Sequence, residues 1–137
     1  MKKHIKMYEN NKNKTNSSLK DLESFLQLIA DLDKEIELFA MGGTAMVLKN
    51  IKEATKDIDF LTASDYETIN ELFRLAGLRE KDSSKLCNIW YLGDKRVDIF
   101  YDEFVMGITL PDDWRELSEY IRSIGKLRLY MSKTTPH

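Results

Sequence analysis

The sequence predicts a single α/β or α+β domain in which helices flank a mixed β-sheet. Its 137 residues match the size of one domain with one hydrophobic core. Apolar residues make up 42% and charged residues 32% of the chain, as in ordinary globular proteins. Segments with apolar residues at helical spacing are interspersed with short strand-like segments. This order favours helices and a sheet packed in layers.

The N-terminal segment precedes the first predicted helix. Residues 1–17 carry five lysines and a single acid, Glu9, and have few apolar residues to pack. We expect a flexible basic tail here in preference to an RNA-binding arm, which is the alternative. A helix is then predicted from Ser18 to about Lys34, because its apolar residues form one stripe at helical spacing. Ser18 is the expected N-cap.

Two strands and a pair of glycines follow. Ile36–Met41 is the first predicted strand, and Gly42 and Gly43 interrupt it. A short helix is predicted from Thr44 to Asn50. The second predicted strand is Lys56–Thr62, in which apolar and acidic side chains alternate between the two faces.

The central part of the chain predicts a helix and a hairpin. A capping box at Ser64–Glu67 favours a helix that runs to Ala76. Leu86–Leu92 and Arg96–Tyr101 are two further strand-like segments. Gly93-Asp94-Lys95 joins them and suits a tight turn, so the two are expected to pair.

The C-terminal part leaves two alternatives open. A helix is predicted to begin at Pro111–Asp113, with Trp114 on its apolar face. Tyr120–Ile124 and Leu127–Met131, which flank Gly125-Lys126, could equally form a late hairpin. The whole of residues 18–137 is expected to be one domain.

Three aspartates are the main candidates for a functional site. Asp is depleted in strands because it packs poorly on a pleated, half-buried surface. Asp57 and Asp59 are two residues apart and therefore share a strand face, and Asp98 lies opposite its apolar strand neighbours in the same way. An acidic cluster of this kind holds Mg²⁺ through oxygen ligands. The alternative is that Asp98 pairs with Lys95 or Arg96 as an ordinary strand residue.

Several classes of protein are disfavoured. Cys87 is the single cysteine, so no intrachain disulfide is possible, and we expect it in the core of a protein from a reducing compartment. The two histidines, His4 and His137, lie at the ends of the chain, where a catalytic triad is not expected. No apolar run approaches the ~20 residues of a membrane span. A cytoplasmic protein without a membrane segment is therefore predicted.

Taken in order, three short motifs resemble a known superfamily. They are Met41-Gly42-Gly43-Thr44-Ala45-Met46, Lys56-Asp57-Ile58-Asp59-Phe60 and Arg96-Val97-Asp98-Ile99-Phe100. This string resembles the nucleotidyltransferase superfamily that includes DNA polymerase beta. It is similar to an uncharacterised prokaryotic branch related to the toxin nucleotidyltransferases of abortive-infection systems. The resemblance covers roughly Leu19 to Tyr130 and implies a nucleotidyltransferase-like fold.

The resemblance also implies a reaction and its residues. A nucleoside monophosphate would pass from an NTP to an acceptor hydroxyl on RNA, protein or a small molecule. Gly42 and Gly43 would form the turn that hosts the triphosphate, and Thr44 would contact phosphate. Two Mg²⁺ or Mn²⁺ ions would be held by three ligands that also serve catalysis: Asp57, Asp59 and Asp98. Asp98 would in addition help to activate the acceptor hydroxyl.

The chain departs from this family pattern at two places. Many members have Gly-Ser where this chain has Gly42-Gly43. Members of this type also continue into a helical region beyond a motif like Met131-Ser132-Lys133, so a form truncated at the C-terminus is expected. The alternative functions are a catalytically silent module that binds a nucleotide or a partner, or a toxin–antitoxin component that acts on RNA.

Overall fold

The fold is seen in a computed structural model that describes residues 16–83, 87–101 and 112–133. The helices are α2 (Leu19–Ala30), α3 (Gly42–Leu48) and α4 (Tyr66–Leu75). The strands are β1 (Ser17–Ser18), β2 (Ile36–Ala40), β3 (Ala54–Thr55), β4 (Ile58–Thr62), β5 (Arg79–Ser83), β6 (Cys87–Leu92), β7 (Lys95–Tyr101), β8 (Glu119–Ile124) and β9 (Leu127–Met131). None of the helices in these ranges is long and apolar enough to cross a membrane.

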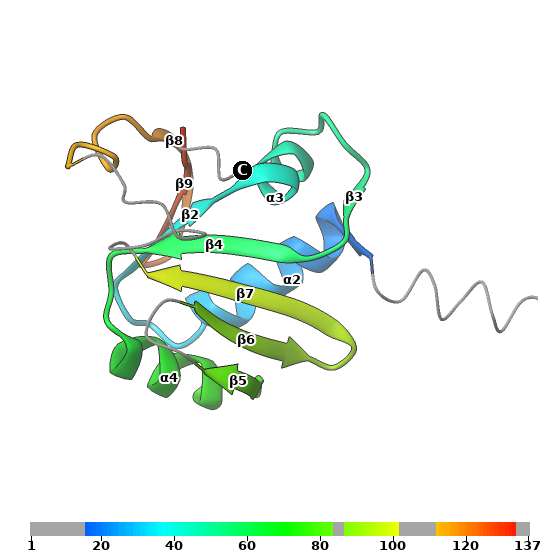
Figure 1. The fold of residues 1–137 in the computed structure, drawn as a ribbon, viewed down its shortest axis with the longest axis vertical. Coiled ribbons are helices and arrows are strands. Elements are labelled where there is room, and N and C mark those ends of the chain that lie inside the picture. Colours follow the sequence, from blue (N-terminus) through cyan, green and yellow to red (C-terminus); the bar gives the residue numbers. More distant parts are fainter. Residues whose placement is uncertain (1–15, 84–86, 102–111, 134–137) are drawn as a thin grey trace, which may run out of the picture.

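One mixed sheet organises the molecule. Its seven strands lie in the order β5-β6-β7-β4-β2-β9-β8, and β1 pairs separately with β3 (Figure 1). The pairs β4–β7 and β2–β9 are parallel, whereas β2 and β4 are antiparallel. Helices and strands are thus mixed as an α+β fold, which confirms the predicted class.

The main core lies between one face of the sheet and the helices α2 and α4. Phe25 of α2 stacks on Phe60 of β4 with ring centroids 5.8 Å apart, and it meets Phe73 of α4 edge-on at 5.7 Å. Phe73 in turn packs edge-on against Trp90 of β6. All four side chains are fully buried. Burial of this face accounts for most of the apolar surface that stabilises the fold.

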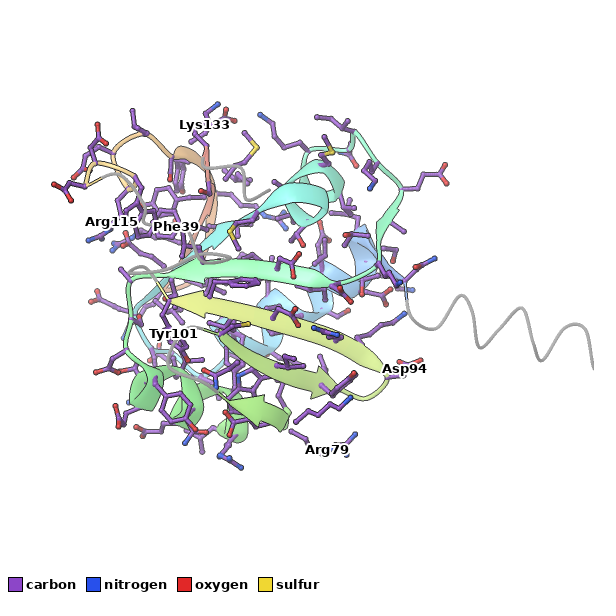
Figure 2. The ribbon with its side chains drawn as sticks, in the orientation of Figure 1. Phe39, Arg79, Asp94, Tyr101, Arg115 and Lys133 are labelled. Carbon is purple, nitrogen blue, oxygen red and sulfur yellow. The ribbon has the colours of Figure 1, made fainter. Side chains whose placement is uncertain are left out.

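The opposite face of the sheet carries a smaller apolar cluster and is otherwise available for polar groups. Phe39 of β2, which Figure 2 labels, forms this cluster with Met41, Leu61 of β4 and Trp114. The side chains of β4 alternate as predicted, because Ile58 and Phe60 belong to the main core and Leu61 does not.

Helix ends follow local hydrogen bonding. Ser18 caps α2, as predicted, and exchanges capping bonds with Asp21. The helix ends at Ala30 and not at Lys34, since Asp33 adopts the left-handed conformation with φ of 58°. The predicted cap of α4 is wrong by one residue: the Asp65 side chain accepts the Thr68 amide at 2.9 Å.

The predicted helix after Pro111–Asp113 is wrong. Residues 112–118 form turns, and Glu119–Ile124 is a strand paired with Leu127–Met131, so the hairpin alternative is the correct one. Gly125, with φ of 57°, allows the tight turn between the two strands. This segment forms a strand despite the helical spacing of its apolar residues, because it pairs with β9, which itself pairs with β2.

Two other parts differ from expectation. The charged strand β5 was not predicted, because its polar sequence carries no alternating apolar pattern at this edge of the sheet. Residues 1–15 of the expected basic tail lie outside the described ranges, as do Leu86 and Pro111. Ser17, the last residue of that expected tail, is buried and pairs with Thr55.

Truncating the aromatic core should destabilise the protein strongly. Phe25→Ala should lower the free energy of unfolding by about 3–5 kcal/mol, because it removes a fully buried ring and leaves a cavity. Leu28→Ala is the matched control on the same helix: Leu28 is 38% exposed and should cost less than about 1 kcal/mol. Urea denaturation measures both values, and equal losses would contradict the described packing of α2.

Candidate functional site

The three aspartates lie on or beside two central strands: Asp59 near the start of β4, Asp98 in the middle of β7 and Asp57 just before β4. Asp59 of β4 and Asp98 of β7 are direct register partners in a parallel pair, so their side chains leave the same face of the sheet. This is the face opposite the main helical core. Asp57 precedes Asp59 by two residues and lies in a bend just before β4, not within the strand as the sequence predicted. The fold therefore brings all three residues to one region.

The carboxylate of Asp59 is in an unfavourable environment for a negative charge. Burial raises its pKa most, and the nearby charges of Asp98 and Asp57 raise it further, to about 7. Arg96 acts in the opposite direction and lowers this pKa. The three carboxylates are thus close enough to interact electrostatically, although they come from two strands.

Asp98 is held by a neighbouring guanidinium. Arg96, two residues earlier on the same face of β7, donates two hydrogen bonds to the Asp98 carboxylate at 2.8 and 3.0 Å. Asp98 is only 6% exposed, so this charge-assisted pair satisfies a buried anion. The same bonds raise the pKa of Arg96. Lys95, the other candidate partner, lies 3.5 Å from Asp21 instead.

Two threonine hydroxyls form hydrogen bonds with the backbone of the Asp57-Ile58-Asp59 segment. Thr44 Oγ1 donates to the Asp57 carbonyl at 3.3 Å and accepts the Asp59 amide at 2.8 Å. Thr55 Oγ1 donates to the same Asp57 carbonyl at 3.1 Å. Both side chains are buried.

The glycine pair has two separate structural roles. Helix α3 begins at Gly42, earlier than the predicted Thr44, and Gly42 has a positive φ of 50°. A Cβ atom on Gly43 would lie 2.5 Å from Thr55 Oγ1, which is too close for any side chain unless Thr55 moves. This contact gives a physical reason for glycine where the resembled family often has serine. Met41, the N-cap of α3, makes no side-chain capping bond to the described residues.

The three aspartate carboxylates are ligands of the kind that a hard divalent cation binds, although their side chains are not arranged as a metal-binding cluster in this structure. Among residues 16–83, 87–101 and 112–133, no group of three acidic, cysteine or histidine side chains is arranged to hold a metal ion. Asp98 is turned toward Arg96, so the predicted three-carboxylate magnesium cluster is not formed as the side chains lie. Carboxylate oxygens are nevertheless the ligands that Mg²⁺ and Mn²⁺ take, and crowded anions favour a cation between them. Asp57, Asp59 and Asp98 are the residues that could hold it.

The structure decides between two expectations for Asp98 and corrects one for Cys87. The alternative pairing of Asp98 with Arg96 is the one that the structure shows. Cys87 was expected in the core, but it is only half-buried. Cys87 lies opposite Phe100 in the β6–β7 pair.

Comparison with known proteins gives a structural likeness. No protein-family model matches the sequence, and no curated protein matches it. The fold is similar to a crystal structure from Thermotoga maritima described as a "putative nucleotidyltransferase". The TM-score is 0.52 with 18% sequence identity, and the match covers 81% of this chain and 78% of the other. The chain therefore has a nucleotidyltransferase-like fold, as the sequence predicted.

Neutralising Asp59 should stabilise the metal-free protein at neutral and higher pH. A carboxyl whose pKa rises from 3.8 in the unfolded chain to about 7 in the folded one weakens folding as pH rises through that interval. Asp59→Asn should therefore be more stable than the wild type at pH 8, by about 1–4 kcal/mol, and the difference should disappear near pH 4.

Urea unfolding at several pH values measures this difference. Asp94→Asn is the control, because Asp94 is exposed in the turn between β6 and β7 (Figure 2). It should leave the pH dependence unchanged. A loss of stability in Asp59→Asn at pH 8 would show that the carboxylate has a structural role.

Removing the guanidinium should raise the pKa of Asp59 beyond about 7. Arg96 is the cation that lowers this pKa, so Arg96→Gln leaves the carboxylate with its anionic neighbours. Carbon-13 NMR titration of the Asp59 carboxyl measures the change. Lys95→Gln removes the adjacent lysine, which pairs with Asp21, and should have a smaller effect. An unchanged or lower pKa in Arg96→Gln would contradict the described electrostatics.

Proposed function

We propose that this protein is a metal-dependent nucleotidyltransferase that moves a nucleoside monophosphate from an NTP to an acceptor hydroxyl. The observation that carries the proposal is the in-register pairing of Asp59 with Asp98 on adjacent central strands, with Asp57 at the start of β4. Few arrangements place three carboxylates in such positions without a cationic ligand to bind. The structural likeness to a protein described as a nucleotidyltransferase supports the same reaction class.

Each proposed residue has a specific task. Asp57, Asp59 and Asp98 would hold Mg²⁺ or Mn²⁺, which when bound neutralises phosphate charge and polarises the reacting phosphoryl group. Gly42, Gly43 and Thr44 form the start of α3, beside which the triphosphate would lie. This arrangement needs no histidine or cysteine, because phosphoryl transfer depends mainly on positioning and charge stabilisation.

The bond changes are those of a substitution at the α-phosphorus. The acceptor hydroxyl oxygen forms a bond to this phosphorus, while the bond from it to the bridging oxygen of the β-phosphate breaks and pyrophosphate leaves. The hydroxyl proton would pass to the Asp98 carboxylate. Arg96 occupies one lone pair on each Asp98 oxygen, so a lone pair on either oxygen is left to accept this proton.

A second candidate is a binding module without catalytic activity. The Arg96–Asp98 pair and the absence of a formed three-carboxylate cluster in the described residues favour it. Such a protein would bind an NTP, a partner or RNA and transfer nothing. The two candidates differ in whether a labelled nucleotide becomes covalently attached.

Transfer from labelled NTPs tests the proposed function. The protein is incubated with each α-labelled NTP and Mg²⁺ or Mn²⁺, with RNA, protein and small-molecule fractions of a cell extract as acceptors. Asp57→Asn and Asp98→Asn should each lower the transfer rate at least ~100-fold, because each removes a charged oxygen ligand. Asp94→Asn should transfer at the wild-type rate.

Three outcomes separate the candidates. Transfer that depends on Asp57 and Asp98 supports the nucleotidyltransferase. Equal transfer by Asp57→Asn would place the reaction elsewhere. NTP binding without transfer to any fraction would favour the silent module.

A further inference from the structure

We propose that Thr44 is a positioning residue, which fixes the Asp57-Ile58-Asp59 segment together with Thr55 and does not itself contact phosphate. The inference rests on the proposed function, since it concerns how the carboxylates of that site are held. It assigns to Thr44 a different role from the phosphate contact that the sequence resemblance implies.

The single hydrogen of the Thr44 hydroxyl is already donated within the protein. A threonine hydroxyl has one hydrogen to donate and two lone pairs that accept. The hydrogen goes to the Asp57 carbonyl at 3.3 Å, and the oxygen accepts the Asp59 amide at 2.8 Å. The residue is 0% exposed. A phosphate could receive this hydrogen only if the bond to Asp57 were given up and the side chain uncovered.

These bonds continue the sheet beyond the end of β2. The ladder between β2 and β4 pairs Ala40 with Phe60, and β2 ends there. At the next step the Met41 amide donates to the Asp59 carbonyl at 3.1 Å, and Thr44 Oγ1 receives the Asp59 amide. The hydroxyl therefore supplies the acceptor that another strand residue would have supplied.

The backbone of Asp57 is also held by hydrogen bonds from threonine hydroxyls. It lies in a bend outside β4, so no strand pairing fixes its backbone. Its carbonyl receives hydroxyl bonds from both Thr44 of α3 and Thr55 of β3. Gly43 makes room for Thr55 at this point, since a side chain there would meet the Thr55 hydroxyl. The spacing of the two carboxylates thus depends on two buried hydroxyls.

Metal affinity and amide exchange together test this role. Thr44→Val keeps the shape of the side chain and removes the hydroxyl, whereas Thr44→Ser retains it. Thr62→Val is the matched control. Thr62, the last residue of β4, is as buried as Thr44, and its hydroxyl also joins a carbonyl, of Glu37, and an amide, of Ser64. Mn²⁺ affinity is measured without nucleotide by calorimetry, and exchange of the Asp59 amide is measured by NMR.

The expected result is specific to position 44. Thr44→Val should weaken Mn²⁺ binding at least ~10-fold and speed exchange of the Asp59 amide, because the amide loses its acceptor. Thr44→Ser and Thr62→Val should keep both properties close to those of the wild type. If Thr44→Val does not fold, Thr55→Val removes one of the two bonds to Asp57 and should weaken Mn²⁺ binding while leaving the Asp59 amide protected.

Other results would overturn the inference. Wild-type Mn²⁺ affinity in Thr44→Val would do so. A separate calorimetric titration with ATP in which this variant loses only ATP affinity would also do so, because that is the sign of a phosphate contact. If the wild-type protein binds no Mn²⁺, the proposed function fails. In that case unchanged Asp59 exchange in Thr44→Val would still overturn the anchoring role, and faster exchange would still support it.

Discussion

The parallel pairing of β4 with β7 is the constraint on which the candidate site depends. It sets Asp59 directly opposite Asp98 and leaves no freedom for the two side chains to diverge to different faces. Burial of Asp59, together with repulsion from Asp98 and Asp57, raises its pKa. A protein that retained this pairing for stability alone would be better served by apolar residues at both positions. The unfavourable charge is therefore best understood as a feature of the site and not of the scaffold.

The two faces of the sheet differ in role: one carries the main hydrophobic core, and the other carries the candidate site. On one face, α2 and α4 bury the aromatic cluster around Phe25 and Phe60, and this packing does not involve the carboxylates. On the other face, the acidic residues lie on central strands whose backbone is held from both sides. Asp59 and Asp98 are thus carried by strands that are paired on both sides, which is the arrangement that precise positioning of ligands requires.

Much of the fold could be predicted because the relevant signals are local. The apolar stripe after Ser18, the alternation around Ile58 and the turn at Gly93-Asp94 each specify their own structure. The strand β5 could not be predicted in this way, since it is a polar edge strand that forms through pairing with a neighbour. The edge strand β8 was predicted only as one of two alternatives for its segment. At the site, the sequence indicated which aspartates to consider and gave the Arg96–Asp98 pair only as an alternative. It could not show that Thr44 faces inward, because this depends on side-chain orientation in three dimensions.

The close approach of Gly43 to Thr55 links two positions that are twelve residues apart. A larger residue at position 43 fits only if the Thr55 side chain moves or is replaced by a smaller one, and either change can leave the Asp57 carbonyl with one hydrogen bond fewer. The two positions therefore cannot vary independently. A serine side chain at position 43 and the threonine hydroxyl at position 55 would occupy the same space. This chain has glycine at 43 and the threonine hydroxyl at 55. We therefore expect the two positions to co-vary in evolution, a change at one being accompanied by a compensating change at the other.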